Sequence, residues 1–281
     1  MGKKKKIPQI VKDIRAFNPR PIDYSYQKNI SYSQFSLFHD CPKRWSLHYK
    51  EGHKVFNSSI HTVFGTALHE VLQHYLDVMY AKSGAEADRI NTYELFQTTL
   101  SGEYEKQYKA NKNKHFSTPE ELRQFFEEGI EIIRDFSKNR GKHFSKRGWW
   151  LVGCEIPGQL APDSWRDKEK KDELKQFQLI LYKKYLSQIF NIDPKKIQIE
   201  YFIVKRQLWE SEDYVIKRIQ AFSPPSGTTK MKRAGVAVQA FLDGAFDYKS
   251  RYKEVKHQPT PNDKCGWCPY HKTHLCKATF T

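Results

Sequence analysis

The sequence has no long hydrophobic run, and this absence limits the classes of protein to which it can belong. No apolar stretch approaches the roughly 18 to 20 residues that a membrane span needs. Residues 1–6, Met-Gly-Lys-Lys-Lys-Lys, lack the apolar stretch of a signal peptide and the serine or threonine that a myristoylation site carries at position six. We therefore expect a soluble protein that is neither exported nor attached to a membrane.

Cysteine is also scarce, with five residues in a chain of 281. An odd number of cysteines, unevenly spaced in a chain without an export signal, does not suit a disulfide framework. The cysteines therefore indicate a reducing compartment and metal binding. Cys154 lies inside an apolar run and is expected to be an ordinary buried residue.

Acidic residues are outnumbered, with 32 aspartates and glutamates against 48 lysines and arginines and a net charge of +16. This excess favours a polyanionic partner, and nucleic acid is favoured over a membrane because no basic amphipathic helix stands out. Aromatic residues alternate with the cations, a combination that suits phosphate neutralisation and base stacking on single-stranded or end-bound DNA. The cation clusters lie at 43–44, 142–147, 183–184, 195–196, 205–206 and 230–233.

Residues 1–30 combine four consecutive lysines with three prolines and little periodicity, which predicts a flexible basic arm. Residues 31–281 are expected to form one domain: a mainly helical part (31–148), core strands with a helix (149–222), and a C-terminal helix with a cysteine-rich tail (223–281).

Apolar periodicity predicts mostly helix around a small sheet, an α+β fold in which a small mixed sheet is flanked by many helices. Thr118-Pro119-Glu-Glu reads as a capping box at the start of one helix. Strands are expected at 149–156 and 197–204 and a loop at 223–227. The predicted helices are a short one capped by Ser33, then about 62–80, 92–110, 119–141, 168–189 and 232–250.

Three cysteines stand close together in the pattern Cys265-x2-Cys268-x7-Cys276, and a fourth, Cys41, lies more than two hundred residues upstream. Two thiolates on one tight turn suit one metal ion or one corner of a cluster. Four thiolates would satisfy a [4Fe-4S] cluster, which would attach the tail to the N-terminal helix. Zinc is the alternative, because the histidines at 271 and 274 can complete a Cys2His2 set.

Residues 30–49 contain Ser-x-Ser, then Cys41-Pro, then an aromatic residue and a tyrosine. This order resembles the opening of iron–sulfur RecB-type nucleases. These belong to the PD-(D/E)XK superfamily and include the AddB helicase-nuclease subunits and the CRISPR-associated exonucleases. The C-terminal cysteine trio completes the resemblance, although its last gap is longer than the family's usual one. Such proteins also occur in bacteriophages, so the resemblance implies a bacterial or phage-infected cytoplasm.

Two further landmarks of that family match. Gly65-x3-His69 fits its Gly-x3-His helix, and Gln178-x3-Tyr182 fits the Gln-x3-Tyr helix that follows its catalytic strands. The resemblance implies a restriction-endonuclease-like core that uses magnesium or manganese. It also implies a DNA substrate and a helicase or recombination partner. His69 would lie at the metal, and Gln178 and Tyr182 would contact the DNA backbone or support the metal ligands.

The centre of the family's site is not intact in this sequence. In the family, the metal ligands come from a β-hairpin with Gly-x-Ile-Asp on one strand and Asp/Glu-x-Lys on the next. In this chain, the hairpin would have to fit into the 22 residues between Glu155 and Gln178. Asp163 and Glu169-x-Lys171 supply the required residue types. However, the five residues between Asp163 and Glu169 are too few to complete one strand and return along another at about 3.3 Å per residue.

Two interpretations therefore stay open. In the first, Asp163 and Glu169 join His69 as metal ligands, Lys171 stabilises charge, and Glu155 faces the metal. In the second, the hairpin is shortened or deleted. The charged run before Gln178 is then the solvated start of its helix, with residue 163 or 164 near the cap.

Three hypotheses for the function follow. The first is a metal-dependent DNA nuclease, acting as an exonuclease on single strands or ends in recombination, replication or repair. The second is a catalytically inactive DNA-binding protein that keeps the nuclease fold. The third is a zinc-ribbon binding module on an unrelated helical body.

Overall fold

The structure is a computed structural model that describes residues 7–18, 28, 30–55, 58–144, 172–206 and 218–278. The chain forms two compact units. The first comprises Met1–Phe17, Asn57–Lys171 and Glu200–Pro224, and the second comprises Asn18–Phe56, Asp172–Ile199 and Pro225–Thr281.

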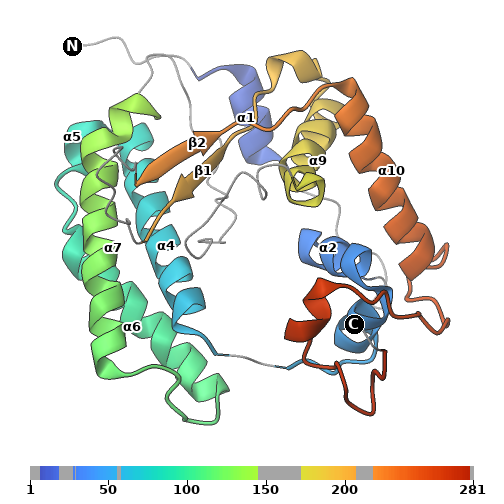
Figure 1. Cartoon of the computed structure of the whole chain (residues 1–281). Coiled ribbons are helices and arrows are strands. Elements are labelled where there is room, and N and C mark those ends of the chain that lie inside the picture. The colour runs from blue at the N-terminus through green and yellow to red at the C-terminus, as the bar shows by residue number, and fades with distance from the viewer. Residues whose placement is uncertain are drawn as a thin grey trace, which may run out of the picture. The chain divides into compact units, whose positions relative to one another are not determined.

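Three long helices form the body of the first unit and lie side by side (Figure 1). They are α4 (Ile60–Ala81), α6 (Thr92–Ala110) and α7 (Pro119–Asn139). All three were predicted from apolar periodicity, and α6 has the predicted bounds. The shorter elements of this unit are α1 (Gln9–Ala16), α5 (Gly84–Ala87) and the 3-10 turn η2 (Arg140–Lys142).

Helix α7 begins where the capping signal predicted. The Thr118 side chain accepts a hydrogen bond from the Glu121 backbone N–H at 3.1 Å, and Pro119 occupies the first helical position. The cap satisfies one of the backbone donors that a helix start leaves unpaired, and proline costs nothing there because its missing N–H would have had no partner.

The core of the first unit is aromatic. Phe64 on α4 packs edge-to-face against Phe96 on α6 and Phe125 on α7, and all three are at most 2% exposed. Gly129 allows this close approach, because a Cβ at that position would lie 2.3 Å from the Phe96 ring. The three helices are therefore held by interlocking side chains rather than by their propensities alone.

A small antiparallel sheet belongs to the same unit. Strand β1 (Tyr201–Val204) pairs with β2 (Ile219–Phe222), and Phe202 packs edge-on against Phe136 of α7. The predicted strand at 197–204 is thus confirmed only in its second half, where the residues become fully apolar. The strand predicted at 149–156 lies outside the described residues. Within the described ranges the fold is helix-rich with one two-stranded sheet, consistent with the α+β class.

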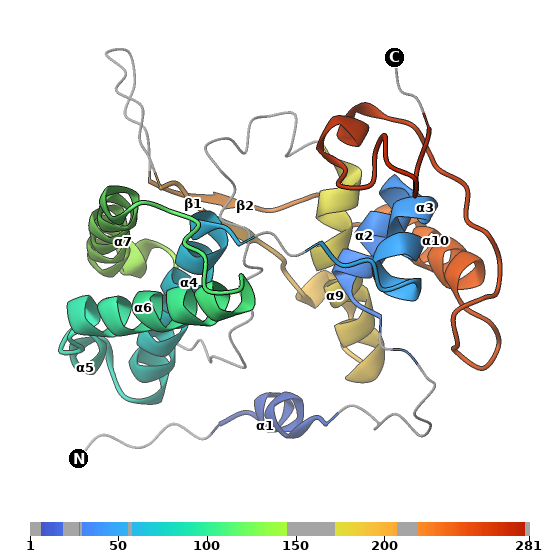
Figure 2. The ribbon, with the colours of Figure 1, turned by 90° about the horizontal axis from the view of Figure 1, so that it is seen from below.

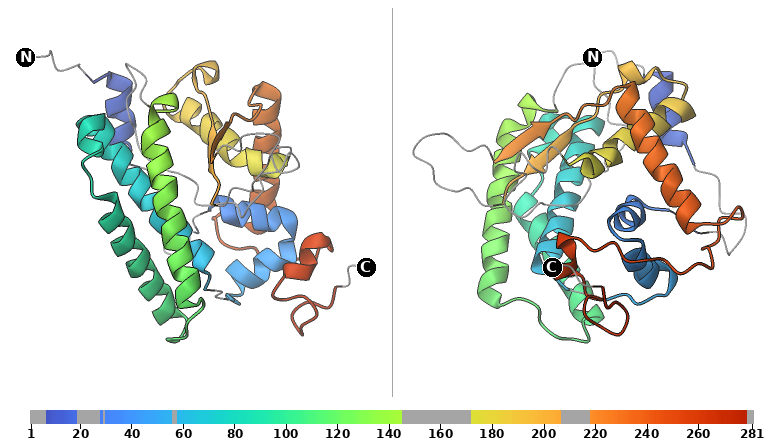
Figure 3. Two further views of the ribbon diagram at one scale, coloured as in Figure 1. Left: turned by 60° about the vertical axis from the view of Figure 1, so that its left-hand side comes forward. Right: turned by 45° about the vertical axis from the view of Figure 1, so that its right-hand side comes forward.

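In the second unit, Figure 3 shows α9 (Glu173–Ile189) and α10 (Thr228–Ala245) side by side. Figure 2 shows the C-terminal tail next to α2 (Tyr32–Asp40) and α3 (Pro42–Trp45). The remaining elements are short: a π-helical turn η1 (Ser46–Lys50) and the 3-10 turns η3 (Pro194–Lys196) and η4 (Asp263–Trp267).

Trp45 is the centre of the second unit's core and is fully buried. Its ring contacts Phe38, Phe241 and His257 edge-on, with centroid separations of 5.3, 6.1 and 5.3 Å. Phe35, Phe177 and Ile180 extend the same cluster between α2, α9 and α10.

Three local predictions were wrong. Ser31, not Ser33, caps α2, because it is the Ser31 side chain that accepts the Gln34 N–H. Helix α9 begins at Glu173, and its cap is Asp172, whose carboxylate accepts two backbone N–H groups. Residues 163 and 164 therefore do not cap it. Helix α10 spans 228–245 rather than 232–250, and the chain turns after Ala245.

The segment predicted as an irregular arm contains α1, whose Val11 is only 6% exposed. The boundaries of the arm and of a single domain at 31–281 stay a prediction. Among the described residues, no helix has both the length and the apolar character to span a membrane.

Candidate functional site

His69 lies on α4, one turn after Gly65, as the Gly-x3-His pattern requires. Its ring is half-buried, and its Nε2 atom is buried without a hydrogen-bond partner among the described residues. Burial lowers the pKa of the imidazole, because removing water penalises the charged form. A neutral imidazole with an unpartnered ring nitrogen has the chemical form of a metal ligand.

The carboxylates predicted to share a metal ion with His69 cannot be placed beside it. Glu155, Asp163, Glu169 and Lys171 all lie outside the described residues. Their roles, and the choice between a literal and a shortened hairpin, stay predictions.

Gln178 and Tyr182 are in contact on α9, as their spacing predicted. The Gln178 Nε2 donates a hydrogen bond to the Tyr182 hydroxyl at 3.3 Å. Tyr182 is 39% exposed, whereas Phe177, Ile180 and Leu181 of the same helix are buried in the core. The pair therefore occupies the solvent face of α9. His69 belongs to the first unit and this pair to the second, and their joint role stays a prediction.

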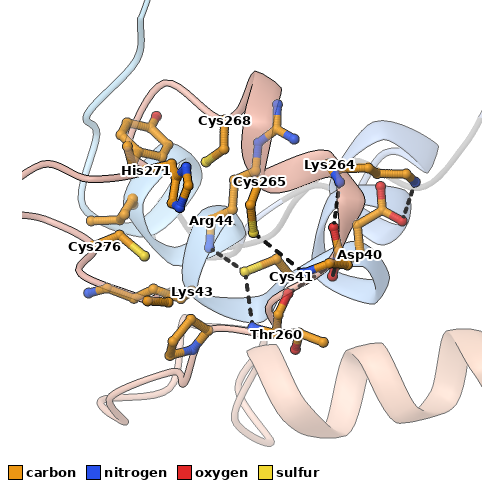
Figure 4. Close-up of a pocket in the computed structure, with 15 residues that line it drawn as sticks. Asp40, Cys41, Lys43, Arg44, Thr260, Lys264, Cys265, Cys268, His271 and Cys276 are labelled. Atoms are coloured by element: carbon orange, nitrogen blue, oxygen red, sulfur yellow. Dashed lines mark hydrogen bonds and ion pairs between the residues drawn. The ribbon is translucent and has the colours of Figure 1, made fainter. Parts of the chain in front are cut away.

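All four predicted cysteine ligands line one pocket of the second unit. Figure 4 shows the side chains of Cys41, Cys265, Cys268 and Cys276 pointing toward a common space, Cys41 from the α2–α3 junction and the others from the tail. The pocket encloses about 440 Å³ of empty space, part of it open to solvent. The fold thus brings Cys41 together with the three C-terminal cysteines, which are more than two hundred residues away in the sequence.

Backbone N–H groups point at two of these sulfurs. Cys41 Sγ accepts hydrogen bonds from the backbone N–H of Arg44 at 3.5 Å and of Thr260 at 3.4 Å. Cys265 Sγ accepts one from Asn262 at 3.5 Å. Such donors orient thiolate ligands and tune a metal centre that they hold. The donor types, four thiols with backbone N–H groups on two of the sulfurs, are therefore those of thiolate-bound metal centres.

The tail is attached to the N-terminal helices by contacts that need no metal. Asn262 donates to the Asp40 carbonyl at 3.0 Å, and Lys264 Nζ lies 2.7 Å from the Asp40 carboxylate. The buried Tyr270 donates its hydroxyl proton to the His53 carbonyl. Burial raises the pKa of Tyr270, with the nearby Cys268 adding to the effect. The predicted meeting of tail and front is therefore observed in this unit.

The metal cluster itself is not shown. Within the described ranges, no three histidine, cysteine, aspartate or glutamate side chains are arranged to hold one metal ion. His271 lines the pocket, and its Nε2 is buried without a hydrogen-bond partner among the described residues. His274 is exposed and does not line it. Of the two histidines considered for zinc, His271 is therefore the better placed.

Several cations that the sequence grouped as DNA contacts have other partners. Lys183 is 8% exposed and donates to the Ser226 hydroxyl at 3.0 Å. Lys230 and Arg233 both pair with Glu173, and Arg206 pairs with Glu128. The helical periodicity of 168–189 could have identified Lys183 as inward-facing, because Lys183 follows the apolar Ile180 by three residues and lies on the same face of the helix.

His257 was not singled out by any sequence pattern. It is 9% exposed against Trp45 and Phe38, and its Nε2 has no hydrogen-bond partner in the described part of the chain. Burial lowers its pKa, as does the nearby Lys50. Only the packing of the tail reveals this position.

Comparison with known protein families identifies part of the chain. Residues 29–158 match the family described as the PD-(D/E)XK nuclease superfamily. This stretch resembles a nuclease. The matched stretch contains Cys41 and His69 and ends before Asp163. Since it covers 130 of 281 residues, less than half, the RecB/AddB type and the iron–sulfur cluster rest on the sequence motifs alone. No curated protein and no solved structure matches the chain significantly.

Proposed function

We propose that this protein is a metal-dependent DNA nuclease of the PD-(D/E)XK superfamily, of the iron–sulfur RecB/AddB type. It would hydrolyse phosphodiester bonds as an exonuclease on single strands or ends, with a helicase or recombination partner. We place it in the cytoplasm of a bacterial or phage-infected cell. The observation that carries the proposal is His69, which fits the Gly-x3-His position inside the stretch that resembles a nuclease and whose buried Nε2 has no hydrogen-bond partner among the described residues.

His69 would hold a magnesium or manganese ion together with Asp163 and Glu169, and Glu155 would face it. A divalent ion bound there supplies Lewis-acid activation of the phosphate and lowers the pKa of the attacking water. Lys171 would stabilise the charge that develops on the phosphate oxygens. These assignments follow the first interpretation of the segment before α9.

Gln178 and Tyr182 would position the substrate. Because the Tyr182 hydroxyl accepts the hydrogen bond from Gln178, its own proton is available to a second acceptor. The pair lies on the solvent face of α9, so a phosphate oxygen of the DNA backbone can be that acceptor. Tyr182→Phe is expected to raise KM for DNA and to leave the fold unchanged.

The activity test is degradation of end-labelled single-stranded DNA with magnesium or manganese. His69→Ala should reduce the rate by at least roughly tenfold to 100-fold, the loss that follows when a residue supporting a metal ligand is removed. His74→Ala is the matched control, because His74 is an exposed residue of the same helix. If the parent protein binds DNA without shortening it under any metal, it is the inactive DNA-binding protein of the second hypothesis.

Glu169→Ala separates the two interpretations of the missing hairpin. If Glu169 is a metal ligand, the variant loses activity together with His69→Ala. An active protein that tolerates both substitutions would show that the metal site was assigned to the wrong residues.

The cysteine pocket would hold a [4Fe-4S] cluster with a structural role. Cys41, Cys265, Cys268 and Cys276 line one pocket, and two of their sulfurs accept backbone N–H donors. Anaerobically purified protein should be brown, with absorbance near about 400 nm and iron and sulfide content that each cysteine substitution lowers. Colourless protein with one zinc per chain would instead support the zinc alternative, for which His271 is the better placed of the two histidines.

A further inference from the structure

Trp267 is exposed to an unusual degree for its residue type. It is 89% exposed, and Tyr248 is the one other large hydrophobic side chain of the described residues to reach that value. Tryptophan carries more apolar surface than any other side chain and is ordinarily largely buried. A single exposed apolar side chain is common on protein surfaces, but Trp267 combines a large ring with a turn held by hydrogen bonds and a neighbouring arginine.

The ring lies on a fixed turn. Trp267 is the last residue of η4, whose start is capped by the Asn262 side chain, which accepts the Lys264 N–H at 3.0 Å. Asn262 also donates to the Asp40 carbonyl, and Cys268 N–H donates to the Cys265 carbonyl at 3.1 Å. The backbone that carries the ring is thus held in place before a partner binds, which limits the conformational freedom that binding would cost.

Tyr248 offers a contrast of equal exposure. Lys249 Nζ lies 5.5 Å from the centroid of the Tyr248 ring, so one face of that ring already has a cation over it. Among the described residues, no ring or cation stacks on Trp267. Both faces of the indole are therefore open to a planar group.

Basic residues outnumber acidic ones in the stretch of chain that contains Trp267, although Lys264 pairs with Asp40. Figure 4 shows the Arg44 side chain running beside the turn that joins Cys265 to Cys268, and within the described part of the chain the Arg44 guanidinium has no ion-pair partner. Residues 255–278 contain four lysines and one acidic residue, Asp263. A partner that combines flat rings with negative charge suits this surface.

We propose that Trp267 stacks on a base of single-stranded DNA while Arg44 binds a neighbouring phosphate. Stacking on an aromatic side chain requires a base whose face is exposed, which a single strand offers and the interior of a duplex does not. Arginine suits the phosphate because its planar guanidinium can form two parallel hydrogen bonds. This inference rests on the proposed function, because it names the strand state of the DNA and the residues that select it.

The test uses the full-length protein, labelled oligo(dT) and a duplex of equal length, with no divalent metal added so that no cleavage occurs. Trp267→Ala should weaken binding of the single strand by about five- to 100-fold, the effect of losing one stacked base. Duplex binding should change by less than about twofold. Trp267→Phe keeps an aromatic ring and should recover most of the affinity. In the parent protein, oligo(dT) should quench the part of the tryptophan fluorescence that comes from Trp267, and Trp267→Phe should lack this quenching.

Two controls make the result decisive. Tyr248→Ala removes an equally exposed ring and should leave both affinities unchanged. Arg44→Gln should weaken single-strand binding and reduce its salt dependence by about one phosphate contact. Unchanged oligo(dT) affinity in Trp267→Ala, or equal losses for single strand and duplex, overturns the inference but leaves the nuclease proposal intact. A parent protein that binds no DNA overturns both.

Discussion

The two units of this protein are stabilised in different ways. The first buries interlocking aromatic rings from three long helices, with Phe64, Phe96 and Phe136 all nearly inaccessible to solvent. The second has a smaller core around Trp45, and its tail contributes little apolar surface: of residues 255–278, His257 and Tyr270 are the buried ones. Packing alone can hold the first unit, whereas the tail contacts its unit mainly through polar groups, such as Asn262 and Lys264 on Asp40.

The largest expected effect comes from removing a cysteine of the pocket. A structural metal site can contribute roughly 10 kcal/mol of folding free energy. Cys268→Ala should therefore abolish amide-exchange protection across residues 255–278 and leave α4, α6 and α7 protected. Hydrogen exchange read by mass spectrometry checks this.

Cys154→Ala is the companion control, because this cysteine is expected to bind no metal and the iron content should stay at the parent level. A tail that stays protected without Cys268 would mean that its contacts with Asp40 and His53 suffice, and the contrast between the units would disappear.

Core truncations come next. Phe64→Ala in the first unit and Trp45→Ala in the second should each cost about 3 to 5 kcal/mol, because each leaves a cavity among rings that cannot collapse. Denaturant titrations measure the loss. Val236→Ala, at a position 62% exposed, should change stability by less than about 0.5 kcal/mol. A small effect at Trp45 would indicate that the second core is loosely packed.

Two glycines test the tightness of each unit at a finer scale. An alanine Cβ at Gly129 would lie 2.3 Å from the Phe96 ring, and one at Gly244 would lie 2.6 Å from the Phe38 ring. Each substitution should destabilise its unit by about 1 to 3 kcal/mol. Gly102→Ala meets nothing within 4 Å and should stabilise α6 by roughly 0.5 to 1 kcal/mol. Thermal unfolding of the three variants decides whether the units are equally well packed.

The smallest expected effect is a pH dependence in the second unit. Burial lowers the pKa of His257 from 6.5, with Lys50 and Lys43 adding to the effect and Glu51 opposing it. Below this value the unfolded chain binds a proton that the folded chain binds less readily, so stability should fall as the pH drops through 6.5. His257→Phe should flatten part of the dependence of the melting temperature on pH. His48, whose pKa is lowered by burial and by Lys54, and His69 of the first unit, whose pKa is lowered by burial, would contribute to the rest. An unchanged curve would mean that His257 is solvated.

Local signals predicted much of the helical structure because they act over a few residues. Thr118 and Pro119 specify the start of α7 through a cap and a fixed backbone angle. The weaker helix predicted at about 92–110 is α6, which buries Phe96 and Leu100. The errors were also local. Ser31 and Ser33 have equal capping chemistry, and only the backbone at Ser31, which is extended, lets its side chain reach the Gln34 N–H.

The sequence by itself determined the helical periods, the basic excess, the cysteine spacing and the motifs that resemble a nuclease, because each depends on residues close together or on totals. Only the tertiary structure decided that Cys41 meets the tail, that Lys183 is buried, that His69 Nε2 has no hydrogen-bond partner among the described residues and that Trp267 faces solvent. The reason is physical. A side chain's partners are chosen by the packing of distant segments, and that packing is a property of the folded chain as a whole.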